Sequence, residues 1–435
     1  MRKHITALAI LMLPALALAG GYTVPNYSPR DLAMCGSLVA AQNGAGAVYV
    51  NPAALAGLDG LNLSVAESLI DLRSDWTASQ GQVVPAQPDG STGARSASMY
   101  PKAVFPPNIY LSYSGEVSGH RYGLGAGFNI PGGGNVFWKN DWPGRFDIIS
   151  VDRKVYAGYL TGGVQVVPGL KLGGGLIYYR TTEVLDRSID FLNGEGYGRL
   201  GTAGDAWSYD VSAEWTPLKD LPLTLALDYK HKGDQKLTGK ATFRNVPAAL
   251  SGVAADQNVT HYLSFPNLLQ LGVSYRVIPE LLITGHYSFE RFVLYNSDMF
   301  VGDQGTTIEV KRSWGNGQVF RLGAEWTTPV EGLKARVGVL RDLAPSDAGH
   351  YSPTLPDADV WGFSVGAGYA FLPGWTVDAA FFRAQFDTVD ASKSVSFPGT
   401  YKDSANVYSI GVSWHVPTGA QASANQGLTA AGLLR

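Results

Sequence analysis

The sequence predicts an all-β protein, a transmembrane antiparallel β-barrel of about 14 strands. Three observations support this fold class. Segments in which apolar residues alternate with small or polar ones recur along the chain. The connections between these segments are alternately short and long, as in barrels that have turns at one rim and loops at the other. The composition lies between that of a soluble protein and that of a helical membrane protein.

Composition excludes several other classes. Charged residues make up 16% of the chain, well below the roughly 25% of a soluble domain. Beyond the N-terminus, no apolar run approaches the ~18–20 residues of a spanning helix. The net charge of −3 offers no basic surface for nucleic acid. No Walker, Rossmann or zinc-ligand spacing is present, so we expect no cofactor and no metal ion.

The first element is a predicted secretory signal peptide, residues 1–19. Arg2 and Lys3 precede an apolar run from Ile5 to Leu18, and Ala17-Leu18-Ala19 forms an A-x-A cleavage site. The apolar run is too short to anchor the chain in a membrane as a helix. We therefore expect the mature chain to begin at Gly20.

The second element, residues 20–59, is rich in small residues and has no strand pattern. Such a segment is too short to build a core of its own, but it could pack inside another structure. It contains the single cysteine of the chain, Cys35, which excludes an internal disulfide. We interpret Cys35 as a small buried residue.

The third element is a series of period-2 segments that begins near residue 60. Between 207 and 215, for example, four large apolar side chains alternate with serine and carboxylate side chains. In a barrel the apolar set faces lipid and the polar set faces the lumen. The strand candidates are 61–72, 107–115, 121–130, 151–167, 169–182, 204–217, 221–234, 261–277, 280–294, 316–328, 331–341, 359–372, 374–387 and 403–416.

The connections agree with this number of strands. Six are short and most contain proline, as in 167–170 and 371–375. Seven are long, so that together they join 14 strands and place all long loops at the outer rim. The long connections are about 73–106, 131–150, 183–203, 235–260, 295–315, 342–358 and 388–402.

The alternation also predicts which charged side chains face the lumen. A carboxylate ligand would require a cation, which makes Lys230 and Arg321 candidates, whereas the alternative is that lumen charges pair with each other. The strand glycines at 123–127 and 173–175 imitate nucleotide-binding spacing but precede no helix, so we interpret them as sites of close approach or bending in the wall. The predicted inward charges are Asp210, Glu214, Asp228, Lys230, Glu290, Arg321 and Glu325.

Several motifs together resemble a known family, the FadL/TodX-type outer-membrane transporters of long-chain fatty acids and other hydrophobic compounds. The most specific motif is Gly36-x-x-x-Ala40-Ala41, followed by Asn51-Pro52-Ala53-Ala54-Leu55, which is similar to the family's hatch segment. Further matches are Asp141-Trp142-Pro143-Gly144-Arg145-Phe146, Phe265-Pro266-Asn267 and the segment from Ser352 to Trp361. Their order covers essentially the whole mature chain.

The resemblance implies a monomeric barrel in the bacterial outer membrane, with a hatch (20–59) inside a multi-pass barrel (60–416) and a C-terminal tail (417–435). It implies passive uptake of long-chain fatty acids or other hydrophobic small molecules, not an enzyme. The ligand would occupy an apolar pocket in the lumen and leave sideways near the third strand, 121–130. The chain departs from the family pattern at its tail and in its short 131–150 loop, which leaves the substrate chain length open.

The resemblance also implies functional residues. The hatch or gate is Asn51, Pro52 and Ala53, and the mature N-terminus, Gly20, Gly21 and Tyr22, would reach the pocket. Lys230 and Arg321, which the alternation places in the lumen, are the candidate cations of that pocket. The candidate entrance surface for ligand is Phe137, Trp138, Trp142 and Phe146.

Each assignment has an alternative. Asn51-Pro52-Ala53 could be an ordinary turn, and the entrance aromatics could form a girdle or pack a loop. The chain could be an aromatic-hydrocarbon channel of the same family, an open porin, or an outer-membrane lipid hydrolase with catalytic residues at its rim. Its seven histidines show no local pairing with a serine or carboxylate motif, which disfavours the hydrolase.

Overall fold

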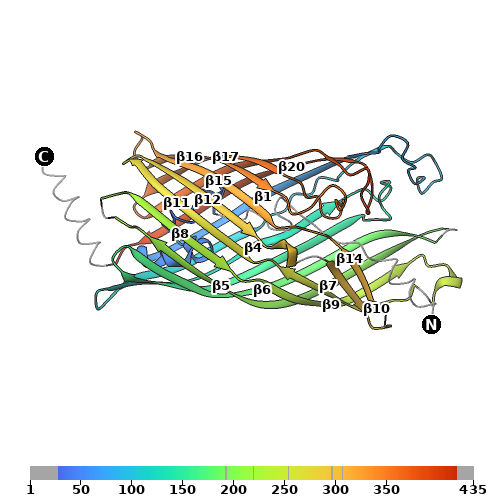
Figure 1. The fold of residues 1–435 in the computed structure, drawn as a ribbon, viewed down its shortest axis with the longest axis horizontal. Helices are drawn as coiled ribbons and strands as arrows, with labels where there is room; N and C mark the ends of the chain where they lie inside the picture. Colours follow the sequence, from blue (N-terminus) through green and yellow to red (C-terminus); the bar gives the residue numbers. More distant parts are fainter. Residues whose placement is uncertain are drawn as a thin grey trace.

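The computed structural model describes residues 28–418 of the chain, apart from 192–193, 219, 253, 295–296 and 306. The predicted signal peptide, the pocket residues Gly20, Gly21 and Tyr22, and residues 419–435 of the predicted tail lie outside this part. The described chain is all-β and winds into one closed antiparallel barrel of 14 strands (Figure 1). The barrel closes where β1 pairs with β20, from Leu61 opposite Val416 to Thr77 opposite Thr400.

The wall consists of long tilted strands, two of which are each interrupted once. One interrupted strand consists of β8 and β9, and its neighbour consists of β10 and β11. In this pair of strands, β9 pairs with β10 and β8 pairs with β11. The bounds of the wall strands are β1 (Gly60–Thr77), β3 (Pro107–Val117), β4 (His120–Phe137), β5 (Ser150–Val167), β6 (Leu170–Asp190), β7 (Glu195–Trp215), β8 (Leu223–Lys230), β9 (Gly233–Arg244), β10 (Gln257–Phe265), β11 (Leu268–Ile278), β12 (Leu281–Glu290), β15 (Gly317–Thr327), β16 (Leu333–Leu343), β17 (Val360–Leu372), β18 (Trp375–Phe386) and β20 (Thr400–Val416).

Short elements complete the fold. Two α-helical turns and a 3-10 helix precede the first strand, and the others lie in the long connections. Among the described residues, no helix is long and apolar enough to cross a membrane. These elements are α2 (Pro29–Leu32), α3 (Ala47–Val50), η1 (Pro52–Gly57), β2 (Ser96–Ser98), η2 (Ala248–Leu250), η3 (Phe292–Leu294), β13 (Ser297–Gly302), β14 (Thr307–Lys311) and β19 (Val389–Asp390).

The alternation of short and long connections is confirmed. The short turns lie at one end of the barrel and the long connections at the other (Figure 1). The alternation of side chains is confirmed as well, because all seven predicted inward charges are buried. The period-2 pattern therefore identified both the wall and its inner face.

Parts of several predicted loops are instead strands. Of the predicted loop 183–203, most belongs to β6 and β7, which pair as far as Asp190 opposite Glu195. Similarly, β9 and β10 occupy much of 235–260, β13 and β14 form a hairpin within 295–315, and β4 runs to Phe137. The outward side chains of β9, such as Lys236 and Lys240, are exposed and polar. Alternation of apolar with polar residues is needed only where a strand meets lipid, so these strand extensions lack the period-2 pattern that predicts a strand.

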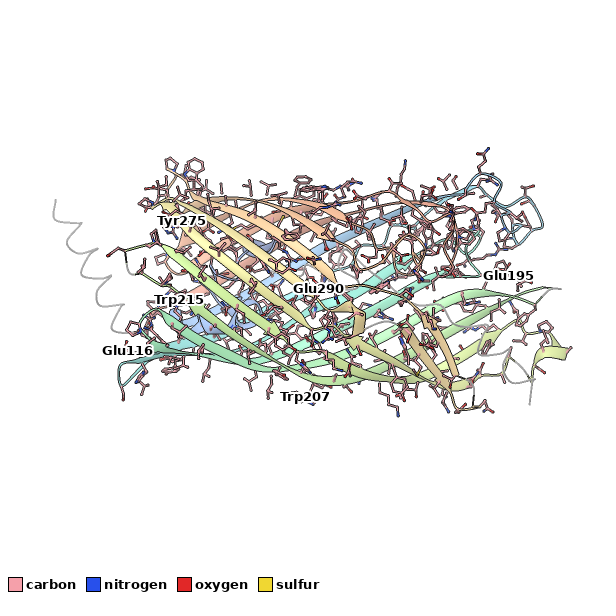
Figure 2. The ribbon with its side chains drawn as sticks, viewed as in Figure 1. Glu116, Glu195, Trp207, Trp215, Tyr275 and Glu290 are labelled. Atoms are coloured by element: carbon pink, nitrogen blue, oxygen red, sulfur yellow. The ribbon has the colours of Figure 1, made fainter. Side chains whose placement is uncertain are left out.

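An apolar band surrounds the half of the barrel nearest the short turns. Trp215 and Tyr275 lie near that end, Trp207 lies about midway and Glu195 lies at the far end (Figure 2). Trp207 is 69% exposed and Trp215 is 49% exposed, as expected for aromatic side chains that meet lipid and its interface. The half of the barrel with the long loops thus projects beyond this band.

Candidate functional site

Residues 28–59 pack inside the barrel as a plug, which we call the hatch. Its 3-10 helix η1 begins at Pro52, directly after Asn51. The side chain of Asn51 accepts a hydrogen bond from the Ala53 N–H (3.2 Å) and donates one to the Val39 carbonyl (2.8 Å). The amide of Asn51 therefore caps η1 and ties it to the rest of the hatch. Both of these partners lie within the hatch.

The inner wall around the hatch is built from glycines. A Cβ atom on Gly173 would lie 2.2 Å from the Ala53 nitrogen, and one on Gly163 would lie 2.5 Å from the Pro52 oxygen. The interpretation of the strand glycines as sites of close approach is confirmed at Gly123 and Gly173, since the wall and the hatch backbone touch there with no room for a side chain. Gly338 meets the backbone of Met34 in the same way, whereas Gly125, Gly323 and Gly366 lie against the side chains of Val48, Ser37 and Ala33, respectively.

Wall hydroxyl groups lie between these glycines and bond the hatch backbone. Small hydroxyl side chains are suited to this position because they satisfy backbone groups without pushing the hatch away. Ser212 Oγ accepts a hydrogen bond from the Ala53 N–H (2.9 Å). Three other serine hydroxyls donate to hatch carbonyls: Ser114 to Leu55 (2.8 Å), Ser274 to Ala40 (2.8 Å) and Ser364 to Ala33 (2.8 Å).

Charged side chains anchor the first helix of the hatch. The Arg30 guanidinium lies 2.9 Å from the Glu325 carboxylate, which also accepts a bond from Arg336 at 2.7 Å. Arg336 in turn lies 2.5 Å from Asp378. Removing one partner from a buried ion pair leaves an uncompensated charge, which is strongly destabilising. The hatch is therefore fixed by charges on one side and by close backbone packing on the other.

A cavity lies in the lumen beside the hatch, and we call it the lumen cavity. Leu32, Cys35 and Tyr49 of the hatch line it, and Glu290, which also lines it, lies midway along the barrel (Figure 2). Most of its wall is apolar or aromatic, which suits a hydrophobic ligand. The main apolar wall residues are Tyr179, Phe265, Leu340, Val360, Phe382, Phe386 and Val407, and the polar ones are Lys230, Gln270, Ser288, Glu290, Arg321 and Asp342.

Both predicted cations line this cavity, but their partners differ. The Lys230 ammonium lies 2.6 Å from Asp228 and 3.9 Å from Asp210. Arg321 is only 8% exposed, donates from Nη1 to the Ser288 hydroxyl at 2.6 Å, and has no hydrogen-bond partner at Nε. None of the described carboxylates forms an ion pair with Arg321. Its buried positive charge is therefore available to a ligand, whereas that of Lys230 is already neutralised.

The wall is discontinuous beside β4. Pairing between β3 and β4 ends at Ile109 opposite Phe128, and the register between β4 and β5 shifts between Asn129 and Gly132. A second cavity, the wall cavity, occupies this gap. Pro131 lines the lumen cavity, while its two neighbours in the bulge line the wall cavity, so the bulge lies between the two. The wall cavity is lined mainly by Ile70, Leu72, Val104, Phe105, Pro106, Ile130 and Gly132 to Gly134, with Lys102 and Lys154 at its edge.

The predicted entrance aromatics divide into two pairs. Trp138 and Trp142 stack with ring centroids 4.1 Å apart, and Trp142 packs edge-on against Trp76 and Phe397. Both tryptophans are almost completely buried, so they join the loop after β4 to β1 and to the loop before β20. Phe137 and Phe146 are half-buried and lie beside the cations of Lys102 and Arg145, respectively.

Tyr49, Cys35 and Asp342 are among the lining residues that the sequence did not assign to the pocket. Tyr49 and Cys35 lie on the hatch, where no periodic pattern indicates which side chains face the cavity. Asp342 lies on β16, and the alternation would have placed it in the lumen had the strand been extended to Leu343. Among the described residues, no cluster of three or more histidine, cysteine or acidic side chains could hold a metal ion.

Comparison with known proteins agrees with the predicted resemblance. The model of the family described as "Outer membrane protein transport protein (OMPP1/FadL/TodX)" matches residues 10–415. The chain belongs to this family. It is therefore an outer-membrane transport protein and not an enzyme, as the sequence predicted.

Three individual proteins illustrate the likeness. The chain is 24% identical over 343 residues to the long-chain fatty acid transport protein of Escherichia coli, covering 77% of this chain and 75% of that protein. The crystal structure of a FadL homologue from Pseudomonas aeruginosa superposes with a TM-score of 0.79 at 18% identity, over 91% of this chain and 99% of that one. The toluene transporter TodX of P. putida gives 0.69 at 13% identity, over 90% and 99%. The two structures share the barrel fold with this chain.

Proposed function

We propose that this protein takes up long-chain fatty acids, with the acyl chain in the lumen cavity and the carboxylate on Arg321. The observation that carries the proposal is a buried guanidinium that forms no ion pair with any described carboxylate, in an otherwise mostly apolar cavity. A bond between such a guanidinium and a carboxylate is charge-assisted and can be bidentate. The E. coli relative, which is named for fatty acid transport, is consistent with this substrate class.

The path has three parts. Ligand first meets the outer loops, where Phe137 and Phe146 keep exposed surface; it then binds in the lumen cavity; it finally leaves through the wall cavity beside β4. Each CH₂ group moved from an apolar site into water costs about 0.8 kcal/mol, so an acyl chain is best kept out of water throughout. The bulge that contains Pro131 separates the two cavities, and its movement would join them.

The hatch closes the periplasmic route. Asn51, Pro52 and Ala53 hold η1 against the glycine wall, and this packing favours a closed carrier over an open porin. The transporter functions as a monomer surrounded by outer-membrane lipid, since one barrel contains the hatch and both cavities. A lateral exit delivers the ligand to the membrane and needs no energy source within the barrel.

The exit can be tested separately from the binding site. Val104→Trp places a large side chain in the wall cavity, while Val83→Trp, in the same connection, changes a side chain that is 91% exposed. We expect Val104→Trp to reduce uptake while ligand still binds in the lumen, and Val83→Trp to leave uptake unchanged. Normal uptake by Val104→Trp would exclude this exit.

A neutral hydrocarbon is the second candidate, favoured by the aromatic lining of the lumen cavity and by the likeness to the toluene transporter. Arg321→Gln discriminates between the two candidates, with Arg73→Gln at an exposed position of β1 as the matched control. Hydrogen bonds to charged groups contribute about 1.5–3 kcal/mol. We therefore expect Arg321→Gln to weaken binding of a long-chain carboxylate roughly 10- to 100-fold.

The alcohol of the same chain length serves as the reference ligand, because it lacks the charge. Its affinity should be unchanged by Arg321→Gln, as should both affinities in Arg73→Gln. Equal loss for carboxylate and alcohol, or no loss for the carboxylate, would refute the head-group assignment and favour the neutral hydrocarbon. If neither ligand binds to the wild-type barrel, the proposed substrate class is wrong.

A further inference from the structure

A continuous chain of hydrogen bonds connects the lumen cavity to the hatch. Arg321 Nη1 lies 2.6 Å from Ser288 Oγ, Ser288 Oγ lies 2.9 Å from His286 Nε2, and His286 Nδ1 lies 2.9 Å from the Gly36 carbonyl oxygen. Arg321 and Ser288 line the cavity, whereas Gly36 belongs to the hatch. We call these four groups the relay. All three of its side chains are buried.

The direction of each bond follows from the chemistry of the groups. The Gly36 carbonyl can only accept, so Nδ1 of His286 carries a hydrogen. A guanidinium can only donate, so Ser288 Oγ accepts from Arg321. The Ser288 hydroxyl hydrogen is then free to bond Nε2 of His286. The hydrogen bonds of the relay therefore all donate in one direction, from the Arg321 guanidinium in the cavity to the Gly36 carbonyl of the hatch.

The relay ends at a turn with unfavourable backbone geometry. Cys35 has a φ of 52° and Gly36 a φ of 73°, so two consecutive residues adopt the left-handed region. This region is disfavoured for a residue with a Cβ such as Cys35, and the surrounding contacts must hold it. Wall residues do so: Ser364 Oγ accepts from the Cys35 N–H at 3.1 Å and lies 3.2 Å from the Cys35 Sγ, and His286 donates to the Gly36 carbonyl.

We propose that the relay reports the head group of the ligand to the hatch. A carboxylate bound to Arg321 competes for the Nη1 hydrogen and offers a stronger acceptor to the Ser288 hydroxyl than the imidazole does. The hydroxyl turns toward the carboxylate, and the imidazole, no longer held at Nε2, rotates away from Gly36. The strained turn then loses its contact with His286, which is the one that holds the Gly36 carbonyl, and the hatch loosens.

This mechanism makes the hatch selective for charge. A neutral ligand fills the apolar part of the cavity but leaves the bond between Arg321 and Ser288 intact, so the hatch stays closed. The inference rests on the proposed function, because it needs a carboxylate at Arg321. It adds that Ser288 and His286 are positioning residues, which act on the hatch through their bonds without closing the path themselves.

Hydrogen–deuterium exchange of the hatch tests the relay. The full-length barrel in detergent is measured alone, with a long-chain carboxylate, and with the alcohol of the same chain length, each at equal occupancy determined by calorimetry. In the wild type we expect the carboxylate to accelerate exchange of amides in residues 33–41 roughly fivefold, as for the loss of one average hydrogen bond. The alcohol should cause no change.

Three variants separate the relay from general loosening. Ser288→Ala breaks the series between Arg321 and His286 and should abolish the difference between the ligands. Ser288→Thr keeps a hydroxyl and should restore that difference. Ser274→Ala is the matched control, because it removes the same kind of bond from wall to hatch, that to the Ala40 carbonyl, outside the relay. Its response to the carboxylate should equal that of the wild type.

The other outcomes overturn the proposal. A full carboxylate response in Ser288→Ala, or its loss in Ser274→Ala, would show that the relay carries no specific signal. A wild-type barrel that binds the carboxylate without a change in the hatch would refute the relay and leave the proposed function standing. Absence of carboxylate binding would refute both.

Discussion

The glycine wall permits a quantitative test of how the hatch is held. Gly173→Ala adds one methyl group, whose carbon would lie 2.2 Å from the Ala53 nitrogen and 2.6 Å from its Cα. Both contacts are backbone atoms, so no side chain can turn aside. Ordinary contact begins at 3.4 Å, so the hatch must retreat by about 1.2 Å at this point.

The expected energy follows from two effects. Overpacking of this kind costs typically 1–3 kcal/mol. The retreat also stretches the bond from the Ala53 N–H to Ser212, which adds about 1 kcal/mol. A total of roughly 2–4 kcal/mol raises the fraction of molecules with an undocked hatch roughly 30- to 1000-fold.

Conductance across a planar bilayer measures this fraction, because an undocked hatch leaves an aqueous path. We expect the wild-type barrel to be nearly silent and Gly173→Ala to show frequent openings. Gly158→Ala is the matched control, since its Cβ would meet nothing within 4 Å. Equal silence in both variants, with equal amounts of folded barrel, would refute the idea that the glycine wall holds the hatch.

Three further predictions concern the gate, the outer loops and pH. Asn51→Ala removes the cap of η1 and should lower fatty acid uptake at an unchanged surface level of the protein; uptake equal to the wild type would contradict a gating role. Trp142→Ala should lower the free energy of unfolding by about 3–5 kcal/mol, because it empties the stacked cluster with Trp138; a denaturant titration measures this, and a change below about 1 kcal/mol would contradict the packing role. Burial raises the pKa of Asp147 in the loop after β4 to about 6, although the Ser396 hydroxyl donates to it. Because this pKa lies above the unfolded value of 3.8, protonation of Asp147 stabilises the folded protein by about 3 kcal/mol relative to the ionised state. This stabilisation is complete below pH 3.8 and is lost as pH rises through 6. Proteolysis of this loop should therefore be faster at pH 8 than at pH 5, and Asp147→Asn should abolish the difference.

The sequence predicted the wall because lipid imposes a strict pattern on it. Outward positions such as Trp207 and Val211 must be apolar, and the positions between them, such as Asp210, must not. The same reasoning failed for 183–203, where the strands stand outside the lipid and no such constraint acts. It also placed Arg321 and Lys230 in the lumen, where the structure brings both to one cavity.

The candidate site was less accessible to sequence reasoning. Alternation shows that a side chain faces the lumen, but not which other side chains it meets there. Lys230 and Arg321 are equivalent by pattern, yet Lys230 forms an ion pair with Asp228, whereas none of the described carboxylates forms one with Arg321. The tryptophans at 138 and 142 looked like an exposed entrance, and only the fold shows that Trp76 and Phe397 cover them.

By itself, the sequence determined that this chain is a plugged outer-membrane barrel, because local periodicity, turn spacing and the small-residue segment depend only on neighbours along the chain. The tertiary structure decided which wall residues the hatch contacts and which of the two lumen cations, Lys230 or Arg321, remains available to a ligand. Those properties depend on groups hundreds of residues apart, such as the Gly36 carbonyl and the His286 imidazole, that meet only when the barrel closes. The bond between wall and hatch, and with it the relay from Arg321, therefore has no signature in the sequence.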